Sequence, residues 1–206
     1  GIIYKYKAVY TMIVNTHLLM SQILYKHVLS NMNFKLDRLA FAYGNIKPDF
    51  INKDINCAHT LDESLYKVNI YSEELMSENI SIKEFSESLG IICHFVCDYF
   101  CLYHRDGNEK KGAYEHLIYE MTLHVKLLTL ILKDKLKLKN HEIFQENVEN
   151  IVLNMEKNYR TEAKSLSKDI TYALSGALQI SESIVYSSQL YFQQKQIDNL
   201  KKYQLN

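Results

Sequence analysis

Apolar side chains recur every three or four positions along most of this chain, which is the spacing of amphipathic helices. The first run predicts a helix over residues 10–30. A second, shorter helix is predicted over 35–43, because the following Gly44 and Asn45 are residues that commonly end helices. A third run predicts a helix over 60–76.

The stretch "SIKE", residues 81–84, has the sequence of a capping box. In this motif the side chains of Ser81 and Glu84 each accept a hydrogen bond from a backbone N–H that the first helical turn leaves unpaired. We expect the helix that begins here to continue to about Tyr103. The polar segment 104–112 then predicts a loop.

Helical periodicity continues through the second half of the chain. It predicts one helix over 113–138, another over 141–166, and a last one over 169–202 that bends near Gly176. The whole pattern therefore predicts about six or seven helices.

The composition supports an all-helical fold. One proline and six glycines in 206 residues leave few positions for the tight turns that sandwiches and barrels need. No repeat, linker or low-complexity tract divides the chain. The sequence thus predicts an all-α, single-domain multi-helix bundle over residues 1–206.

The charge pattern narrows the set of partners and locations. Acidic and basic residues balance at 24 each, so the sequence carries no strong nucleic-acid signal. No uninterrupted apolar stretch reaches the roughly 18 residues of a transmembrane segment. The beginning of the chain has no visible signal peptide, which favours a cytoplasmic location, whereas a leader already removed would make the protein secreted.

The cysteines do not have the spacing of a disulfide framework or a zinc ribbon. Cys93, Cys97 and Cys101 follow one another at intervals of four, on one stripe of a helix. We interpret them mainly as small core residues in a reducing compartment, with a redox or metal role as the alternative.

Two imidazole–carboxylate pairs stand out against this apolar background. His94 and Asp98 lie four residues apart in "HFVCDYFCLYH", and His116 and Glu120 have the same spacing in "HLIYE". Such pairs share one helix face and can bind one cation such as Zn²⁺. A single buried histidine is more often a hydrogen-bonded core residue, and such a pair is often a surface ion pair. Several buried polar groups need a common partner, however, and a metal cluster supplies one.

The ordered series of these residues resembles the bacterial zinc-dependent phospholipase C family, whose all-α fold also describes the S1/P1-type nucleases. The resemblance covers roughly residues 15–124. The residues that match the family's ligand order are His17, Asp49 in "KPDF", His59, His94, Asp98, His104, His116 and Glu120.

The resemblance implies two or three Zn²⁺ ions. It assigns the first ion to Asp49, His59, His94 and Asp98. It assigns the second to His104, His116 and Glu120. It assigns a third to His17, with Asp98 as a bridging carboxylate. In the family an N-terminal Trp completes the third position; this chain has no Trp, and the family's usual interval before His17 reaches Tyr4, an internal residue.

The implied activity is hydrolysis of a phosphodiester bond, and a glycerophospholipid substrate would release diacylglycerol and a phosphorylated head group. Asp49 would orient or deprotonate the attacking water. Phe50 matches one aromatic residue of the family's choline-binding cage, whereas Asn56 and Lys7 stand where the family has the other aromatic and an acidic residue. The sequence therefore predicts a phospholipid or other phosphodiester substrate and transient contact with a membrane surface, without a choline preference.

Two other functions remain open at this point. An S1/P1-like nuclease or nucleotidase would keep the metals and change the substrate. A degenerate, non-catalytic member would use one or two ions only to tie helices together.

Overall fold

The computed structural model describes residues 2–108 and 112–204. In these residues the chain forms nine α-helices and one 3₁₀-helix, and no strand. The elements in chain order are α1 (Ile2–Met32), α2 (Arg38–Gly44), α3 (Lys47–Phe50), α4 (Leu61–Ser77), α5 (Ile82–Tyr99), η1 (Leu102–His104), α6 (Ala113–Leu132), α7 (Val148–Thr161), α8 (Leu166–Ser187) and α9 (Gln189–Gln204). The predicted all-α fold is confirmed, with more helices than the six or seven expected.

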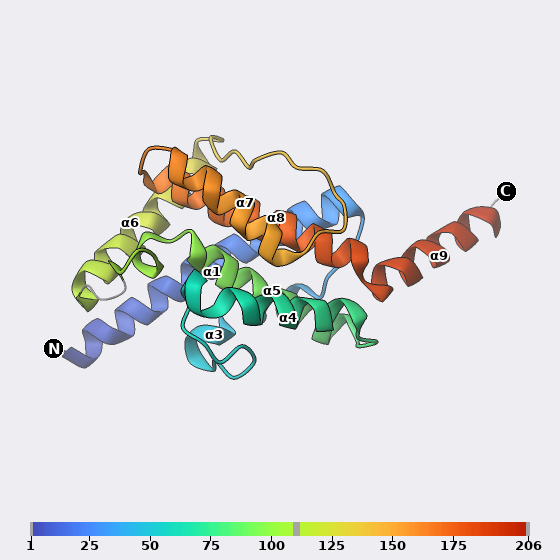
Figure 1. Ribbon diagram of the computed structural model, residues 1–206, viewed down its shortest axis with the longest axis horizontal. Helices are drawn as coiled ribbons and strands as arrows, with labels where there is room; N and C mark the ends of the chain where they lie inside the picture. The colour runs from blue at the N-terminus through green and yellow to red at the C-terminus, as the bar shows by residue number, and fades with distance from the viewer. Residues whose placement is uncertain (1, 109–111, 205–206) are drawn as a thin grey trace.

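Helix α5 is the centre of the bundle. It packs against α2, α4 and α8, and its side chains from Leu89 to Tyr99 are all buried. In Figure 1, α4, α5, α7 and α8 lie lengthwise in the body, while α9 projects from one end. The predicted capping box is present: Glu84 N–H donates to Ser81 Oγ at 3.2 Å, and Ser81 N–H donates to Glu84 Oε2 at 3.0 Å. The helix ends at Tyr99, four residues before the predicted Tyr103.

Two glycines allow α2 and α5 to approach closely. A Cβ atom on Gly44 would lie 2.0 Å from the Glu87 carbonyl oxygen, and one on Gly90 would lie 2.4 Å from the Phe41 carbonyl oxygen. Backbone atoms cannot move aside as a flexible side chain can, so any larger residue would force the helices apart. This crossing brings the backbone of Asn45 against α5.

The prediction of helices over 113–138 and 141–166 was wrong at their junction. Helix α6 ends at Leu132, and α7 begins only at Val148. Residues 135–147 instead form an extended strap along α8, which is visible at the top of Figure 1. Leu136 and Leu138 are half buried while their lysine neighbours are exposed, and this two-residue alternation is the period of an extended chain rather than of a helix.

Hydrogen bonds to α8 side chains hold the strap in place. Lys139 N–H donates to Ser175 Oγ at 2.8 Å, and Ser183 exchanges hydrogen bonds with the backbone of Glu146 at 2.9 and 3.0 Å. His141 forms an ion pair with the buried carboxylate of Glu182. An extended segment cannot pair its own backbone groups, so these bonds replace the helical ones that the sequence predicted.

Three further predictions of helix boundaries need correction. The last predicted helix is two helices that part at Ser188, because the Ser188 hydroxyl accepts a hydrogen bond from Tyr191 N–H as α9 begins. Gly176 lies inside the continuous helix α8. The four-residue helix α3, which has Pro48 in its first turn, was not predicted. Residues 109–111 of the predicted loop lie outside the described residues.

None of the helices in the described part of the chain is long and apolar enough to cross a membrane.

Candidate metal centre

The carboxylate of Asp98 lies at the centre of a group of imidazoles. Asp98 Oδ2 is 2.8 Å from His59 Nδ1 and 3.2 Å from His94 Nε2. Asp98 Oδ1 is 3.3 Å from His17 Nε2 and 3.9 Å from His104 Nε2. Four histidines from α1, the loop before α4, α5 and η1 therefore meet around one carboxylate of α5.

The orientation of His94 is fixed by the backbone. Its Nδ1 lies 2.8 Å from the carbonyl oxygen of Asn45, so Nδ1–H donates and Nε2 faces the centre. The side chain is fully buried. The glycine crossing of α2 and α5 thus has a direct consequence for the site, since it places the carbonyl that orients this imidazole.

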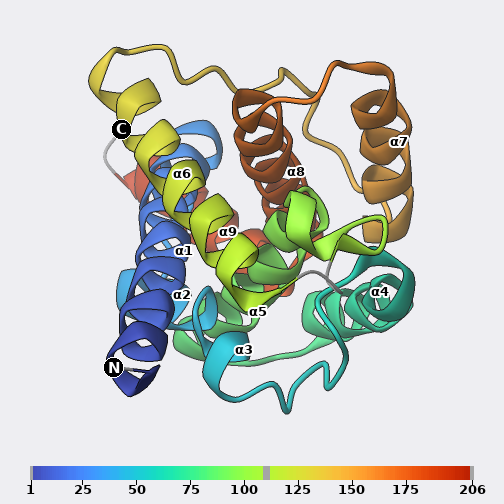
Figure 2. The same cartoon turned by 90° about the vertical axis from the view of Figure 1, so that its left-hand side faces the viewer.

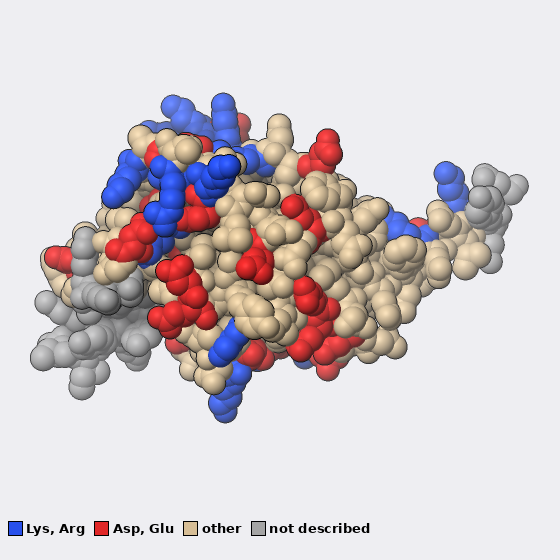
Figure 3. Space-filling view, in the orientation of Figure 1, with Lys and Arg blue, Asp and Glu red and all other residues tan. Residues whose placement is uncertain are grey.

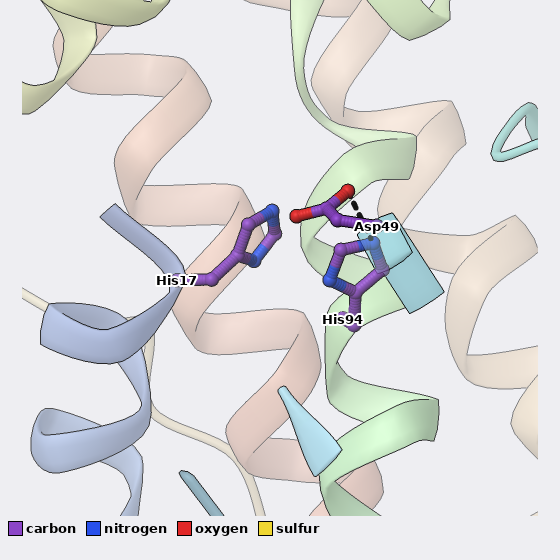
Figure 4. A group of neighbouring side chains, drawn as sticks. All are labelled: His17, Asp49 and His94. Carbon is purple, nitrogen blue, oxygen red and sulfur yellow. Dashed lines mark ion pairs between the residues drawn. The ribbon is translucent and has the colours of Figure 1, made fainter. Parts of the chain in front are cut away.

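The carboxylate of Asp49 points toward the imidazoles of His17 and His94 (Figure 4). Asp49, on α3, has Oδ1 3.5 Å from His94 Nε2. The rings of His17 and His94 stack with centroids 4.1 Å apart. The donor atoms of these three residues all lie within 4.8 Å of one another, which is close enough for one ion.

His59 comes from the loop of residues 51–60 rather than from a helix. An Asn52 side chain braces this loop by donating to the Cys57 carbonyl at 2.6 Å and accepting from Asn56 N–H at 3.1 Å. Asn56 has a φ of 53°, in the left-handed region that asparagine tolerates better than most residues. The imidazole then reaches His94, with His59 Nδ1 3.2 Å from His94 Nε2.

A second group of donors surrounds Glu120 of α6. His116 Nε2 lies 3.4 Å from Glu120 Oε1, and the His116 and His104 rings have centroids 5.4 Å apart. The Cys101 thiol donates to Glu120 Oε1 at 3.4 Å. Donor atoms of Cys101, His104 and Glu120 lie within 4.8 Å of one another, so the structure joins Cys101 to the group that the sequence assigned to His104, His116 and Glu120.

A buried tyrosine–aspartate network supports η1 from behind. The hydroxyl of Tyr119 donates to Asp169 Oδ2 at 2.7 Å and accepts from Leu102 N–H at 3.1 Å. Tyr159 donates to the other oxygen of Asp169 at 2.6 Å. These contacts anchor the start of η1, the element that carries His104.

The charges of the centre are strongly coupled. Burial alone would raise the pKa of the Asp98 carboxyl, but the imidazoles of His104 and His94 hold it well below its usual value. Burial alone would lower the pKa of His94, yet the carboxylates of Asp98 and Asp49 raise it to about 9. Burial lowers the pKa of His104. Burial and the neighbouring Glu120 raise the pKa of the Cys101 thiol well above its usual value.

The donor atoms fit a zinc ion in two respects. Among the described residues, His17 Nδ1, Asp49 Oδ2 and His116 Nε2 are buried without any hydrogen-bond partner, an arrangement that costs free energy unless a ligand satisfies them. Ligand atoms of a tetrahedral zinc, bonded at about 2.0–2.2 Å, lie roughly 3.3 Å apart. His94 Nε2 is 3.2–3.5 Å from its donor neighbours in Asp98, His59 and Asp49.

Comparison with known proteins agrees with this chemistry. Residues 16–169 match the sequence model of the family described as zinc-dependent phospholipase C. The chain belongs to the zinc-dependent phospholipase C family. Its membership confirms the resemblance seen in the sequence and supports a metal-dependent function of the phospholipase type. No curated protein and no solved structure matches the chain.

In this phospholipase C-like chain, the structure adds two contacts to the sequence-based assignment. His17 Nε2 lies 3.3 Å from Asp98 Oδ1, and His17 also groups with Asp49 and His94. His116 Nε2 lies 3.4 Å from Glu120 Oε1, and Cys101 also groups with His104 and Glu120. The sequence offered one signal for Cys101, its position three residues before His104, but the four-residue cysteine spacing favoured a core role.

The remaining predicted positions lie at the edge of the centre. Phe50 follows Asp49 on α3 and is 58% exposed, so it is open to a substrate and does not pack in the core. The side chain of Tyr4, the residue that the family's usual interval before His17 reaches, lies outside the described residues. Cys93 and Cys97 are fully embedded in the core, as expected.

Proposed function

We propose that this protein is a zinc-dependent phosphodiesterase that cleaves glycerophospholipids in the manner of a phospholipase C. The observation that carries the proposal is the meeting of His17, His59, His94 and His104 around Asp98. This arrangement lies inside the segment that matches the zinc-dependent phospholipase C family. Family membership alone supports the reaction class, and the buried donors support a metal-dependent route to it.

Two or three zinc positions are consistent with the donors. One is supported by His94 with Asp98 and His59, a second by Glu120 with His104 and His116, and a third by His17 with Asp49. When bound, zinc supplies Lewis-acid stabilisation of phosphoryl charge and lowers the pKa of a water molecule.

The protein's own groups would orient the reactants. Asp49 Oδ1 faces His94, while Asp49 Oδ2 is buried and has no hydrogen-bond partner. Asp49 Oδ2 is therefore available to accept a hydrogen bond from the attacking water and then its proton. Phe50, exposed on the next position of α3, offers an apolar contact for the substrate at the edge of the centre.

The test is an assay on three substrates: p-nitrophenyl phosphorylcholine, phosphatidylcholine vesicles and single-stranded DNA. We expect turnover of the first two, loss of turnover on chelation, and recovery with added zinc. Cleavage of DNA without release from vesicles would favour the nuclease function instead. Fewer than two zinc ions per chain and no turnover of any phosphodiester would favour a non-catalytic member.

His94→Ala should lower turnover at least about a hundredfold and remove zinc from its position, because ligand loss disrupts both binding and charge stabilisation. The matched control is His27→Ala, which removes a half-buried imidazole of α1 outside the centre. A His94→Ala variant with normal turnover and normal zinc content, measured by elemental analysis, would contradict the proposal.

A further inference from the structure

The outward side of α6 carries an unbroken stripe of exposed apolar side chains. They are spaced alternately four and three residues apart, which keeps them on one face of the helix. The residues of this stripe are Tyr114, Ile118, Met121, Val125, Leu128 and Leu132. Leu132, at its end, is 84% exposed, and Val125, near its middle, is 58% exposed. A soluble helix normally turns such a stripe toward the core.

The opposite side of α6 already makes the core contacts of this helix. Leu123 and Leu127 are buried there, and Glu120 and His116 point toward the candidate metal centre. The exposed stripe is thus a second apolar face, which no described residue covers. An apolar face of this length on a protein surface typically marks a docking site.

Lysines flank the stripe near its C-terminal end. Lys126 lies beside it on α6, and Lys133, Lys135 and Lys137 follow where the strap leaves the helix. None of these four has an ion-pair partner among the described residues, whereas Lys139 pairs with Glu162 at 3.0 Å. Asp134 is the one acidic residue of segment 126–139. Figure 3 shows Lys and Arg over the upper left of the molecule, interspersed with Asp and Glu, in the region where α7 and the end of α6 lie.

The apolar stripe lies at the same end of the molecule as the edge of the centre. Figure 2 looks onto this end, where α6 crosses in front and α3 lies below it. Helix α3 carries Phe50, and Ile51 follows it; both side chains are exposed.

We propose that the apolar stripe of α6 and the lysines near its C-terminal end bind the surface of an anionic phospholipid bilayer. Helices that combine an apolar face with lysines at its edge lie in the interfacial plane of such membranes. The lysines supply charge complementarity to acidic head groups and the stripe supplies buried apolar area. The role of this binding, which is to deliver the metal centre to a membrane-embedded substrate, rests on the proposed function. The binding itself does not depend on catalysis.

A second copy of the chain fits this surface less well. Self-association through the stripe with the two α6 helices parallel would bring two sets of unpaired lysines close to each other, and like charges across an interface oppose association. An anionic bilayer reverses the sign of that interaction.

The test measures co-sedimentation of the chelated protein with vesicles of phosphatidylcholine that contain a fifth of phosphatidylserine. Val125→Asp with Leu132→Asp should lower the partition coefficient at least about tenfold, because each substitution removes buried apolar area and adds a repelled charge. The matched control is Leu39→Asp on α2, where the leucine is 83% exposed, and it should bind as the wild type does. Replacing Lys133, Lys135 and Lys137 by serine should lower binding about fivefold per lysine and weaken its salt dependence.

Three results would overturn the inference: no binding by the wild type, unchanged binding by the aspartate pair, or a wild-type dimer in sedimentation that the aspartate pair dissociates. Turnover of soluble p-nitrophenyl phosphorylcholine separates this inference from the proposed function. If the aspartate pair loses only vesicle turnover, both stand. If the protein turns over the soluble substrate but does not bind vesicles, only the docking inference is wrong. If it binds vesicles but turns over no substrate, only the proposed function is wrong.

Discussion

At the scale of single residues, the centre depends on which nitrogen of each imidazole faces inward. For His94, the Asn45 carbonyl accepts a hydrogen bond from Nδ1–H, which leaves Nε2 facing inward. The carboxylate of Asp98 lies against the inward nitrogens of His59 and His94. A ligand held in this way loses little side-chain entropy when it binds an ion. The position of a backbone carbonyl is therefore as important here as the identity of the ligands.

A substitution of Cys101 tests whether its sulfur is a zinc ligand or only a hydrogen-bond donor to the second group. Its thiol donates to Glu120 Oε1, and a serine hydroxyl can keep that donation. We expect Cys101→Ser to retain its zinc content and its turnover within about threefold, since hydrogen bonds to a ligand tune a site without forming it. Elemental analysis and the soluble phosphodiester assay measure both. Loss of one zinc equivalent would instead identify the sulfur as a ligand.

His141 gives the fold a pH dependence that is separate from the centre. Its hydrogen bond with Glu182 raises its pKa above the ordinary value, although burial opposes the shift. A raised pKa in the folded state means stabilisation that is complete below about pH 6.5 and is lost as the pH rises through the folded-state pKa.

We therefore expect His141→Gln to lower the free energy of unfolding by about 2 kcal/mol at pH 5.5, as for a hydrogen bond to a charged group. The difference from the wild type should shrink by pH 9. Urea unfolding of both proteins at the two pH values measures it, and the titration of other histidines cancels in the comparison. A difference that grows with pH would show that the sign is wrong.

The sequence revealed the residues of the centre better than their partnerships. The two pairs at four-residue spacing are a local property of a helix, so His94 with Asp98 and His116 with Glu120 could be predicted as neighbours. His17 approaches both Asp98 and Asp49, and this depends on how α1, α3 and α5 pack, which no local pattern encodes. For Cys101 a metal role was only the alternative, because its spacing fits a core stripe equally well.

At the scale of elements, the close crossing of α2 and α5 connects packing with the site. Gly90 lies one helical turn before His94, and the same approach puts Asn45 within hydrogen-bond distance of that imidazole. A disturbance of the crossing should therefore reach the centre without touching a ligand.

Gly90→Ala should lower the free energy of unfolding by about 3 kcal/mol, because its Cβ meets backbone atoms that cannot yield, and it should also reduce zinc content. Gly176→Ala is the matched control: a Cβ there would lie 3.2–3.4 Å from side-chain atoms only, and these can shift. We expect the control to stay within about 1 kcal/mol of the wild type. Chemical denaturation and elemental analysis measure both variants, and equal effects would refute the backbone explanation.

The strap shows why some elements were predicted correctly from the sequence and others were not. Helices with long three- and four-residue periodicity, such as α1, α4 and α5, were found within a few residues of their ends, apart from the beginning of α1. The "KLKLK" stretch contains both lysines and leucines, good helix formers, and its two-residue alternation is short. Here the serine hydroxyls of α8 stabilise the extended conformation, because they form hydrogen bonds with the backbone of the strap. These partners are present only in the folded chain.

At the scale of the whole molecule, the candidate ligands join elements far apart in the chain. They come from α1, α3, the loop of residues 51–60, α5, η1 and α6. Any ion bound by them would connect parts of the chain that are independent in the unfolded state. Metal binding and folding should therefore be coupled.

Free zinc at a hundred times its dissociation constant should stabilise the fold by about 2.7 kcal/mol. For a chain of this length that corresponds to a rise of about 5–10 °C in Tm. Differential scanning calorimetry of the chelated and the zinc-loaded protein measures the shift. The His94→Ala variant should show a much smaller shift, and an equal one would mean that zinc stabilises the fold from somewhere else.

Helix α9 leaves the body of the molecule at the end opposite α6 (Figure 1). A biotin or dye introduced in its last described turns would consequently serve as a handle. Tethered by that handle to a sensor chip, the protein would present its α6 end to the flowing solution, and arrival of lipid particles could be recorded in real time with no label near the histidines.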